Sequence, residues 1–163
     1  MSNFVIYLAL PVHIAQWLTH ALGSPVRFPA KSAENAIITR FIQRLPKGAD
    51  PDVAAEGLTA ICIPESKAKD PAYYNYMGPL GKEALVQSIR ILFRINLWNE
   101  LGAALVEDTR GVNAQVFAWC ELHGIDLDHM EPVRQMFYRM RRSYTKSGII
   151  LIKNTKKRGD DSA

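Results

Sequence analysis

A basic segment late in the chain carries the side chains best suited to bind a polyanion. Residues 132–158 contain nine Lys or Arg side chains and no acid: Arg134, Arg139, Arg141, Arg142, Lys146, Lys153, Lys156, Lys157 and Arg158. Residues 1–131 hold 11 basic and 14 acidic side chains, so the formal net charge of +4 arises in this segment. Each Lys or Arg that neutralises a phosphate releases a condensed counterion, so the segment predicts a polyanionic ligand. A solvated basic helix and tail without a partner would have the same charge.

Within this segment, helical spacing predicts a helix over residues 131–146 with two different faces. One stripe is apolar and suited to pack on a core: Val133, Met136, Phe137, Met140 and Tyr144. The opposite side carries Gln135, Arg139, Arg142 and Lys146, flanked by Arg134, Tyr138 and Arg141. Guanidinium, ammonium and amide groups are those that bind phosphates and base edges in a major groove.

The helix predicted over residues 112–123 and the basic helix that follows it resemble a helix-turn-helix. Gly124 stands at the turn, and Ile125 falls where the motif has an apolar residue. Pro132 would lie inside the recognition helix of a standard motif, where a proline costs about 3 kcal/mol. The chain avoids this cost if the last helix begins later, with Pro132 in its first turn. The connection is then longer than in a standard helix-turn-helix.

This helix pair is also similar to the ends of uncharacterised phage or mobile-element proteins. The similarity covers about 35 residues and ends at Phe137-Tyr138-Arg139-Met140-Arg141-Arg142-Ser143-Tyr144. It implies DNA binding in a bacterial cytoplasm and brings no catalytic residue. We therefore expect the last helix to contact duplex DNA, with Lys153 and residues 156–158 as a flexible arm. A homodimer would suit this interpretation, because two DNA half-sites require two DNA-binding units.

Two other classes of function remain open. In the first, the protein is an interaction or scaffold subunit whose basic face meets an acidic partner. In the second, it is an enzyme with a cleft at the carboxyl ends of N-terminal strands, near Pro11 and residues 64–67. The sequence has no GxSxG, HExxH or paired-carboxylate pattern. Residues 78–83 are similar to the end of a phosphate-binding loop, but Tyr76 and Glu83 stand where that motif has its first Gly and its Ser or Thr. No catalytic residue is assigned.

The histidines and cysteines predict no metal or other cofactor. His123 and His129 flank a loop with Asp126 and Asp128, a pattern more typical of turn and capping residues than of metal ligands. The two cysteines, Cys62 and Cys120, stand alone within apolar runs, which predicts buried free thiols.

The elements that position the basic helix follow from the hydrophobic pattern. Residues 4–10 and 58–63 predict strands buried on both faces, and residues 26–28 predict a short edge strand. A helix over residues 13–22 and another from an N-cap at Ser32 to a stop at Pro46 complete a β-α-(β)-α-β unit. Helical spacing continues over residues 82–106, as one helix or two broken near Asn96. We expect a helix-rich α+β fold, with this small unit followed by a three- to four-helix bundle.

Length and hydropathy set the organisation of the chain. The 163 residues predict a small α/β unit over residues 1–70, a helical bundle over 71–148 and a short apolar run with a basic tail over 149–163. No window of about 18 uncharged apolar residues predicts a membrane span. The first residues lack the basic region of a signal peptide, so we expect a cytoplasmic protein.

Overall fold

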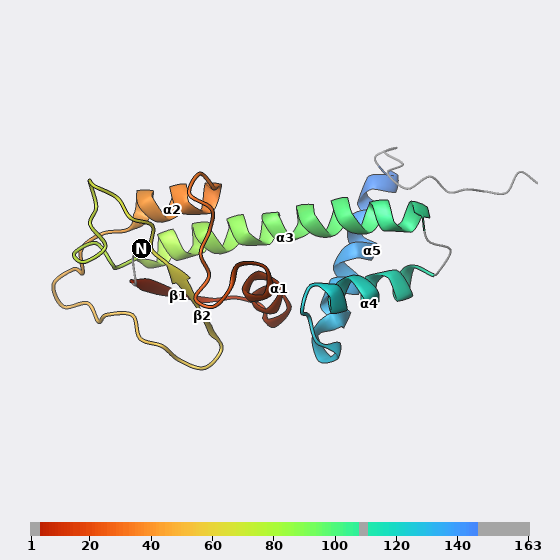
Figure 1. The fold of residues 1–163 in the computed structure, drawn as a ribbon, viewed down its shortest axis with the longest axis horizontal. Coiled ribbons are helices and arrows are strands. Elements are labelled where there is room, and N and C mark those ends of the chain that lie inside the picture. Colours follow the sequence, from red (N-terminus) through yellow and green to blue (C-terminus); the bar gives the residue numbers. More distant parts are fainter. Residues whose placement is uncertain (1–3, 108–110, 147–163) are drawn as a thin grey trace, which may run out of the picture.

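The computed structural model of the chain describes residues 4–107 and 111–146. Its elements are β1 (Val5–Ala9), α1 (Val12–Leu22), α2 (Ala33–Phe41), β2 (Leu58–Cys62), α3 (Pro79–Glu107), α4 (Val112–Leu122), the 3-10 helix η1 (Leu127–His129) and α5 (Met130–Lys146). The predicted helix-rich α+β fold is confirmed. In Figure 1, α3 runs along most of the molecule, with the two strands and α2 beside one end and α4 and α5 beside the other. Within the described ranges, no helix is long and apolar enough to cross a membrane.

The N-terminal unit is built on a two-stranded antiparallel sheet. β1 pairs with β2 so that Ile6 lies opposite Ile61, and Val26 forms a parallel bridge to Ile61 on the other side of β2. The predicted edge strand is thus reduced to a bridge at one residue. The expectation that the first strand is buried on both faces is wrong. Alternate residues of a strand point to opposite faces, and in β1 Ile6 and Leu8 are buried while Val5 and Tyr7 are half-buried.

Helix α2 begins as predicted and ends earlier than predicted. The Ser32 hydroxyl accepts a hydrogen bond from the Asn35 amide at 3.2 Å, which caps the N-terminus. The helix ends at Phe41 rather than near Pro46, because Ile42 adopts an extended conformation and is buried there. The Lys69 ammonium then donates to the carbonyl oxygens of Thr39, Arg40 and Ile42 at 2.7, 3.2 and 3.1 Å. Lys69 thereby satisfies carbonyl groups that the end of the helix leaves unpaired.

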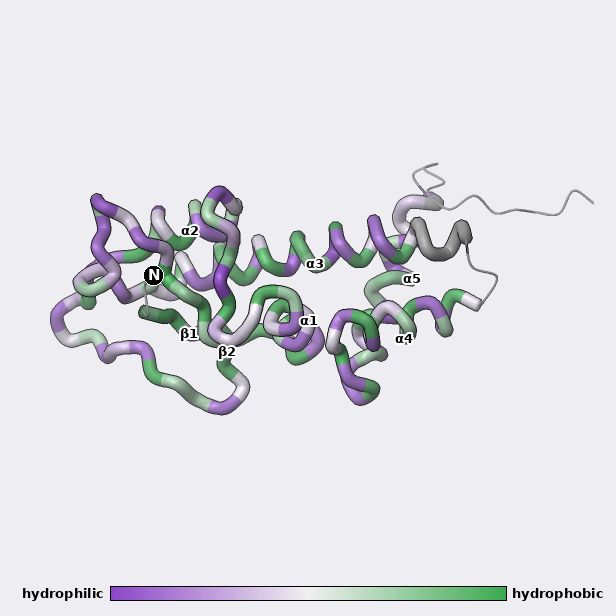
Figure 2. The backbone as a smooth tube through the Cα atoms, viewed as in Figure 1, coloured by the Kyte–Doolittle hydropathy of each residue, from purple (hydrophilic) through white to green (hydrophobic). Residues whose placement is uncertain are grey.

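Helix α3 is continuous from Pro79 to Glu107, which answers the question that the sequence left open at Asn96. The Asn96 side-chain amide donates to the Leu92 carbonyl at 3.0 Å, and the backbone remains helical at this residue. Leu85, Ile89, Phe93, Leu97 and Leu101 recur every four residues and are fully buried. The alternation of apolar and polar residues along α3 can be followed in Figure 2. Buried residues from Ile6 to Met140 form one hydrophobic core along this helix.

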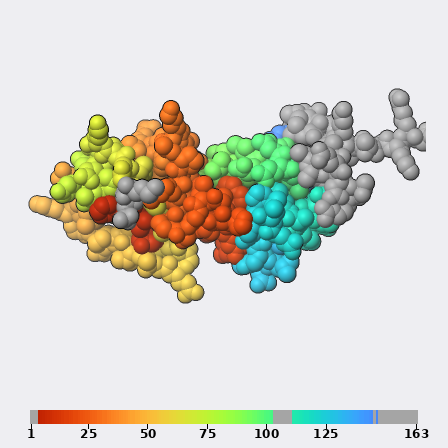
Figure 3. Space-filling model, in the orientation of Figure 1, coloured from red at the N-terminus to blue at the C-terminus, as the bar shows by residue number. Residues whose placement is uncertain are grey.

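Helix α1 holds the connection between α4 and α5 in place. The Gln16 side chain donates to Asp126 Oδ2 at 2.7 Å and accepts from the Asp126 amide at 3.2 Å. Gly124 has a φ of +76°, and a Cβ there would lie 2.7 Å from the His20 ring. A residue with a side chain would be both strained and sterically blocked at this turn. On the face shown in Figure 3, the surfaces of α1 and of the α4–α5 connection are in contact.

Candidate nucleic-acid interface

The buried side of α5 fixes the orientation of the helix. Val133 and Phe137 are fully buried, and Met140 is nearly so. The Trp98 ring from α3 lies between Phe137 and Tyr144, with ring centroids 5.4 and 4.8 Å away. Pro132 lies in the first turn of α5, as expected, and η1 makes the connection from α4 longer than in a standard helix-turn-helix. The opposite side of α5 is thereby directed to solvent.

The structure brings most of the predicted contact residues to this exposed side of α5. Gln135, Arg139, Arg142 and Lys146 are exposed, and Arg134 and Arg141 are half-buried. The remaining predicted contacts lie outside the described residues: Lys153, Lys156, Lys157 and Arg158. The arrangement of Arg139, Arg142 and Lys146 on one face follows directly from helical spacing.

A hollow of about 370 Å³ lies between these side chains. Its lining comprises Arg134, Gln135, Tyr138, Arg139 and Arg142, without an acidic residue. The Tyr138 hydroxyl donates to Asn113 Oδ1 of α4 at 3.0 Å, so α4 fixes the aromatic wall of the hollow. Three guanidinium groups around one small space favour an anion such as a phosphate.

Arg134 differs from the other arginines because Glu131 already binds it. Arg134 Nε and Nη2 donate to the two Glu131 carboxylate oxygens at 2.9 and 2.5 Å. The Gln135 amide also donates to Glu131, at 3.3 Å. The hydrogen bonds from Arg134 hold the pKa of Glu131 below its usual value, and Glu131 raises the pKa of Arg134. The charge pattern predicted Arg134 as a contact and missed Glu131, although the i, i+3 spacing of the two was visible.

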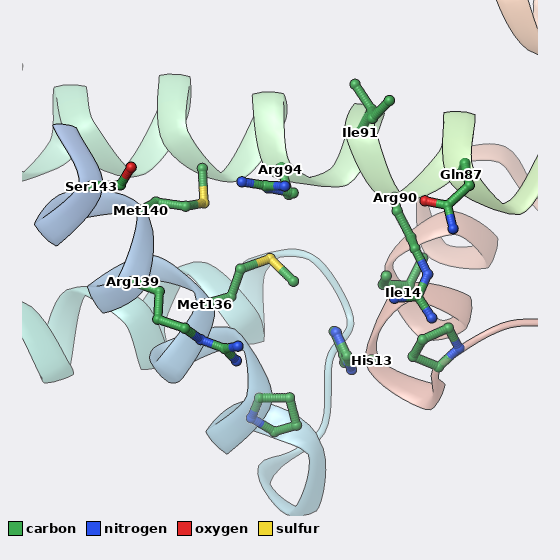
Figure 4. A pocket seen from close by; sticks show the side chains of 12 residues that line it. His13, Ile14, Gln87, Arg90, Ile91, Arg94, Met136, Arg139, Met140 and Ser143 are labelled. Atoms are coloured by element: carbon green, nitrogen blue, oxygen red, sulfur yellow. The ribbon is translucent and has the colours of Figure 1, made fainter. Parts of the chain in front are cut away.

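Two further arginines lie near α5 that the charge pattern did not single out. Arg90 and Arg94 of α3 are exposed and border the same cavity as Arg139, as Figure 4 shows. Their proximity to Arg139 depends on the packing of α3 against α5, which helical spacing alone cannot reveal.

The single cleft that the enzyme interpretation places near Pro11 and residues 64–67 is divided between two separate cavities. β1 and β2 are antiparallel, so their carboxyl ends lie at opposite edges of the sheet. Pro11 lines the cavity beside α5, whereas Pro64 and Glu65 line a separate cavity of about 530 Å³ with Cys62. Cys62 and Cys120 are buried free thiols, as predicted, and burial raises the pKa of Cys120 to about 12. Among the described residues, no group of three or more His, Cys, Asp or Glu could hold a metal ion.

The fold and the site together define a helix-rich α+β protein with an anchored basic helix. Protein-family models, curated proteins and solved structures contain no match to this chain. The geometry of α5 is therefore the observation that bears on function.

Proposed function

We propose that the protein binds duplex DNA through the exposed face of α5, as a regulator in a phage or mobile element. The observation that carries this proposal is the pairing of two faces on one helix: an apolar face fixed against Trp98 and an exposed face with Arg139, Arg142 and Lys146. The finer role rests on the similarity of residues 112–144 to phage and mobile-element protein ends. The proposal includes a homodimer, because two DNA half-sites require two DNA-binding units. It also places the protein in the cytoplasm.

The spacing of the side chains suits a nucleic-acid backbone. Arg139 and Arg142 are three residues apart, and such residues lie about 5–6 Å apart on a helix surface. A single α-helix fits the major groove of B-DNA, which is about 12 Å wide. Gln135 adds an amide that can pair with a base edge, whereas Arg134 is partly neutralised by Glu131.

The decisive experiment compares two charge-reversal triples by fluorescence anisotropy with labelled duplex and single-stranded DNA. In the first, Arg139, Arg142 and Lys146 are changed to Glu. In the control, the exposed loop residues Lys31, Lys47 and Lys67 are changed to Glu, which alters the net charge equally. We expect wild-type duplex binding to survive about 150 mM salt, with a log–log salt slope of roughly −3 or steeper. The α5 triple should bind at least about tenfold more weakly, and the control should bind almost as wild type.

Equal losses in both triples would contradict a DNA surface on α5 and would indicate attraction to net charge alone. Loss of all duplex binding near about 150 mM salt would also contradict the proposal. That result would favour the alternative, in which the basic face of α5 meets an acidic protein partner. All six side chains are exposed, so each triple variant should remain folded. Circular dichroism of each variant checks this.

A further inference from the structure

A second cavity, distinct from the hollow on α5, lies where α1, α3 and α5 meet. Its volume is about 600 Å³, within the range of about 300–1,000 Å³ that is usual for small-molecule sites. Figure 4 shows Arg90 reaching from α3 toward α1, while Met136 and Arg139 project from α5 into the same space. The cavity therefore brings together three helices from distant parts of the chain.

The polar side of this cavity is strongly cationic. Arg90, Arg94 and Arg139 line it, and no Asp or Glu is among its lining residues. Within residues 4–107 and 111–146, the guanidinium groups of Arg90 and Arg94 make no hydrogen bond or ion pair. Arg139 has a long hydrogen bond of 3.4 Å from Nε to the Gln135 carbonyl, which leaves its terminal amino groups for a ligand. Three like charges around one cavity repel one another, and a bound polyanion would remove that repulsion.

The other side of the cavity is apolar, with one buried imidazole. Ile14, Met136 and Met140 line this side, and methionines adapt readily to a flat ring. His13 is 8% exposed, and its Nε2 is buried without a hydrogen-bond partner among the described residues. Burial and the nearby Arg90 charge lower the pKa of His13, which favours the neutral imidazole. An unpartnered buried polar atom is costly, so a ligand that hydrogen-bonds His13 would gain affinity.

We propose that this cavity binds a nucleoside diphosphate or triphosphate. The phosphates would be held by Arg90, Arg94 and Arg139, whose planar guanidinium groups bind phosphate oxygens in pairs. The base would lie against Met136 and Met140, where its ring replaces water on apolar surface. Three cations and an apolar wall match a ligand that carries both several negative charges and a ring. Binding at this cavity does not require that the protein bind DNA.

The test uses isothermal titration calorimetry of the full chain with ADP, pyrophosphate and adenosine. The test variant is the double change Arg90→Ala and Arg94→Ala, and the matched control is the double change Lys31→Ala and Lys47→Ala at exposed loop residues outside the cavity. We expect saturable ADP binding that weakens at least about tenfold in the double variant and stays within about twofold in the control. Pyrophosphate should bind more weakly than ADP, and adenosine more weakly still.

Absence of saturable ADP binding at about 1 mM, or equal ADP affinity in wild type and the double variant, would overturn the proposal. Pyrophosphate binding as tightly as ADP would overturn the role of the base and leave a site for phosphate groups alone. Both replaced arginines are exposed, so the double variant should keep its fold, and thermal denaturation without ligand checks this. No DNA is present in the experiment, so its failure leaves the DNA proposal untouched.

Discussion

At the scale of single residues, Glu131 limits the positive charge of α5. It is the one acidic residue in the sequence of this helix, and it engages Arg134 through two hydrogen bonds. Both side chains are exposed at least in part, so their pairing contributes little to stability. Its main consequence is electrostatic, because a phosphate must compete with Glu131 for the Arg134 guanidinium.

The change Glu131→Gln is therefore expected to tighten duplex binding by releasing Arg134. One additional phosphate contact would make the log–log salt slope steeper by about 0.9. Anisotropy across a salt series measures this slope. Glu83→Gln, an equal charge change at an exposed site near the start of α3, should leave the slope unchanged. A Glu131→Gln variant with the wild-type slope would show that Arg134 does not reach the DNA.

Asp126 provides a second residue-scale prediction, on acid stability. A short contact with His129 Nδ1 at 2.5 Å and the hydrogen bond from Gln16 hold the pKa of Asp126 below its usual value of 3.8. A carboxyl with a depressed pKa stabilises the fold above its unfolded-state pKa, and this stabilisation is lost as the pH falls through the folded-state pKa. Asp126→Asn should therefore lower the urea midpoint near about pH 6, by a difference that shrinks as the pH falls below 3.8.

Asp128→Asn serves as the matched control, because Asp128 is a nearby exposed acid on the same connection. Its urea midpoint should follow that of the wild type across the same pH range. A difference between Asp126→Asn and wild type that stays constant into acid would contradict the argument. It would mean that the contacts of Asp126 do not depend on its charge.

At the scale of elements, the packing of α2 on α3 depends on Gly81. A Cβ at Gly81 would lie 2.7 Å from Phe41 Cβ and 2.8 Å from Met77 Cγ. Gly81→Ala gains about 1 kcal/mol in helix propensity but must separate the two helices, which typically costs about 1–3 kcal/mol. Because Phe41 Cβ is close to the backbone and cannot move alone, we expect the steric cost to prevail and the protein to be destabilised.

Gly102→Ala is the matched control within the same helix. Nothing lies within 4 Å of a Cβ built on Gly102, so propensity alone should act there and stabilise the protein by up to about 1 kcal/mol. Urea denaturation of both variants measures the difference in the free energy of unfolding. Equal effects at Gly81 and Gly102 would show that α2 can move away from α3 at little cost.

Features set by neighbouring residues could be predicted from the sequence, whereas features set by distant packing could not. The faces of α5 were predictable because the periodicity of Val133 and Phe137 against Arg139 and Arg142 is local. The end of α2 was not, because the apolar residues after Phe41 keep helical spacing while Ile42 is buried in an extended conformation. The cavity beside Arg90 could not be predicted from the sequence either, because it depends on how α1, α3 and α5 pack together.

At the scale of the whole molecule, Arg139 belongs to both of the proposed anion-binding regions. It lines the hollow with Arg134 and Arg142 on one side and the cavity with Arg90 and Arg94 on the other. One guanidinium cannot bind a phosphate in both places at once. The cavity also lies between α1, which anchors the α4–α5 connection, and α3, which anchors α5. A ligand there contacts the elements that orient the basic face.

If both proposals hold, ADP and DNA should compete for Arg139. Saturating ADP is expected to raise the dissociation constant for duplex DNA by about fivefold, a coupling of about 1 kcal/mol. By reciprocity, saturating DNA should weaken ADP binding by the same factor. Anisotropy with labelled duplex at constant ionic strength measures the first effect, and calorimetry the second. In the Arg90→Ala, Arg94→Ala variant, the ADP concentration that saturates the wild type should change the DNA affinity much less, because ADP binds this variant more weakly. An equal ADP effect in that variant would instead identify simple charge competition on α5, because the cavity would then play no part.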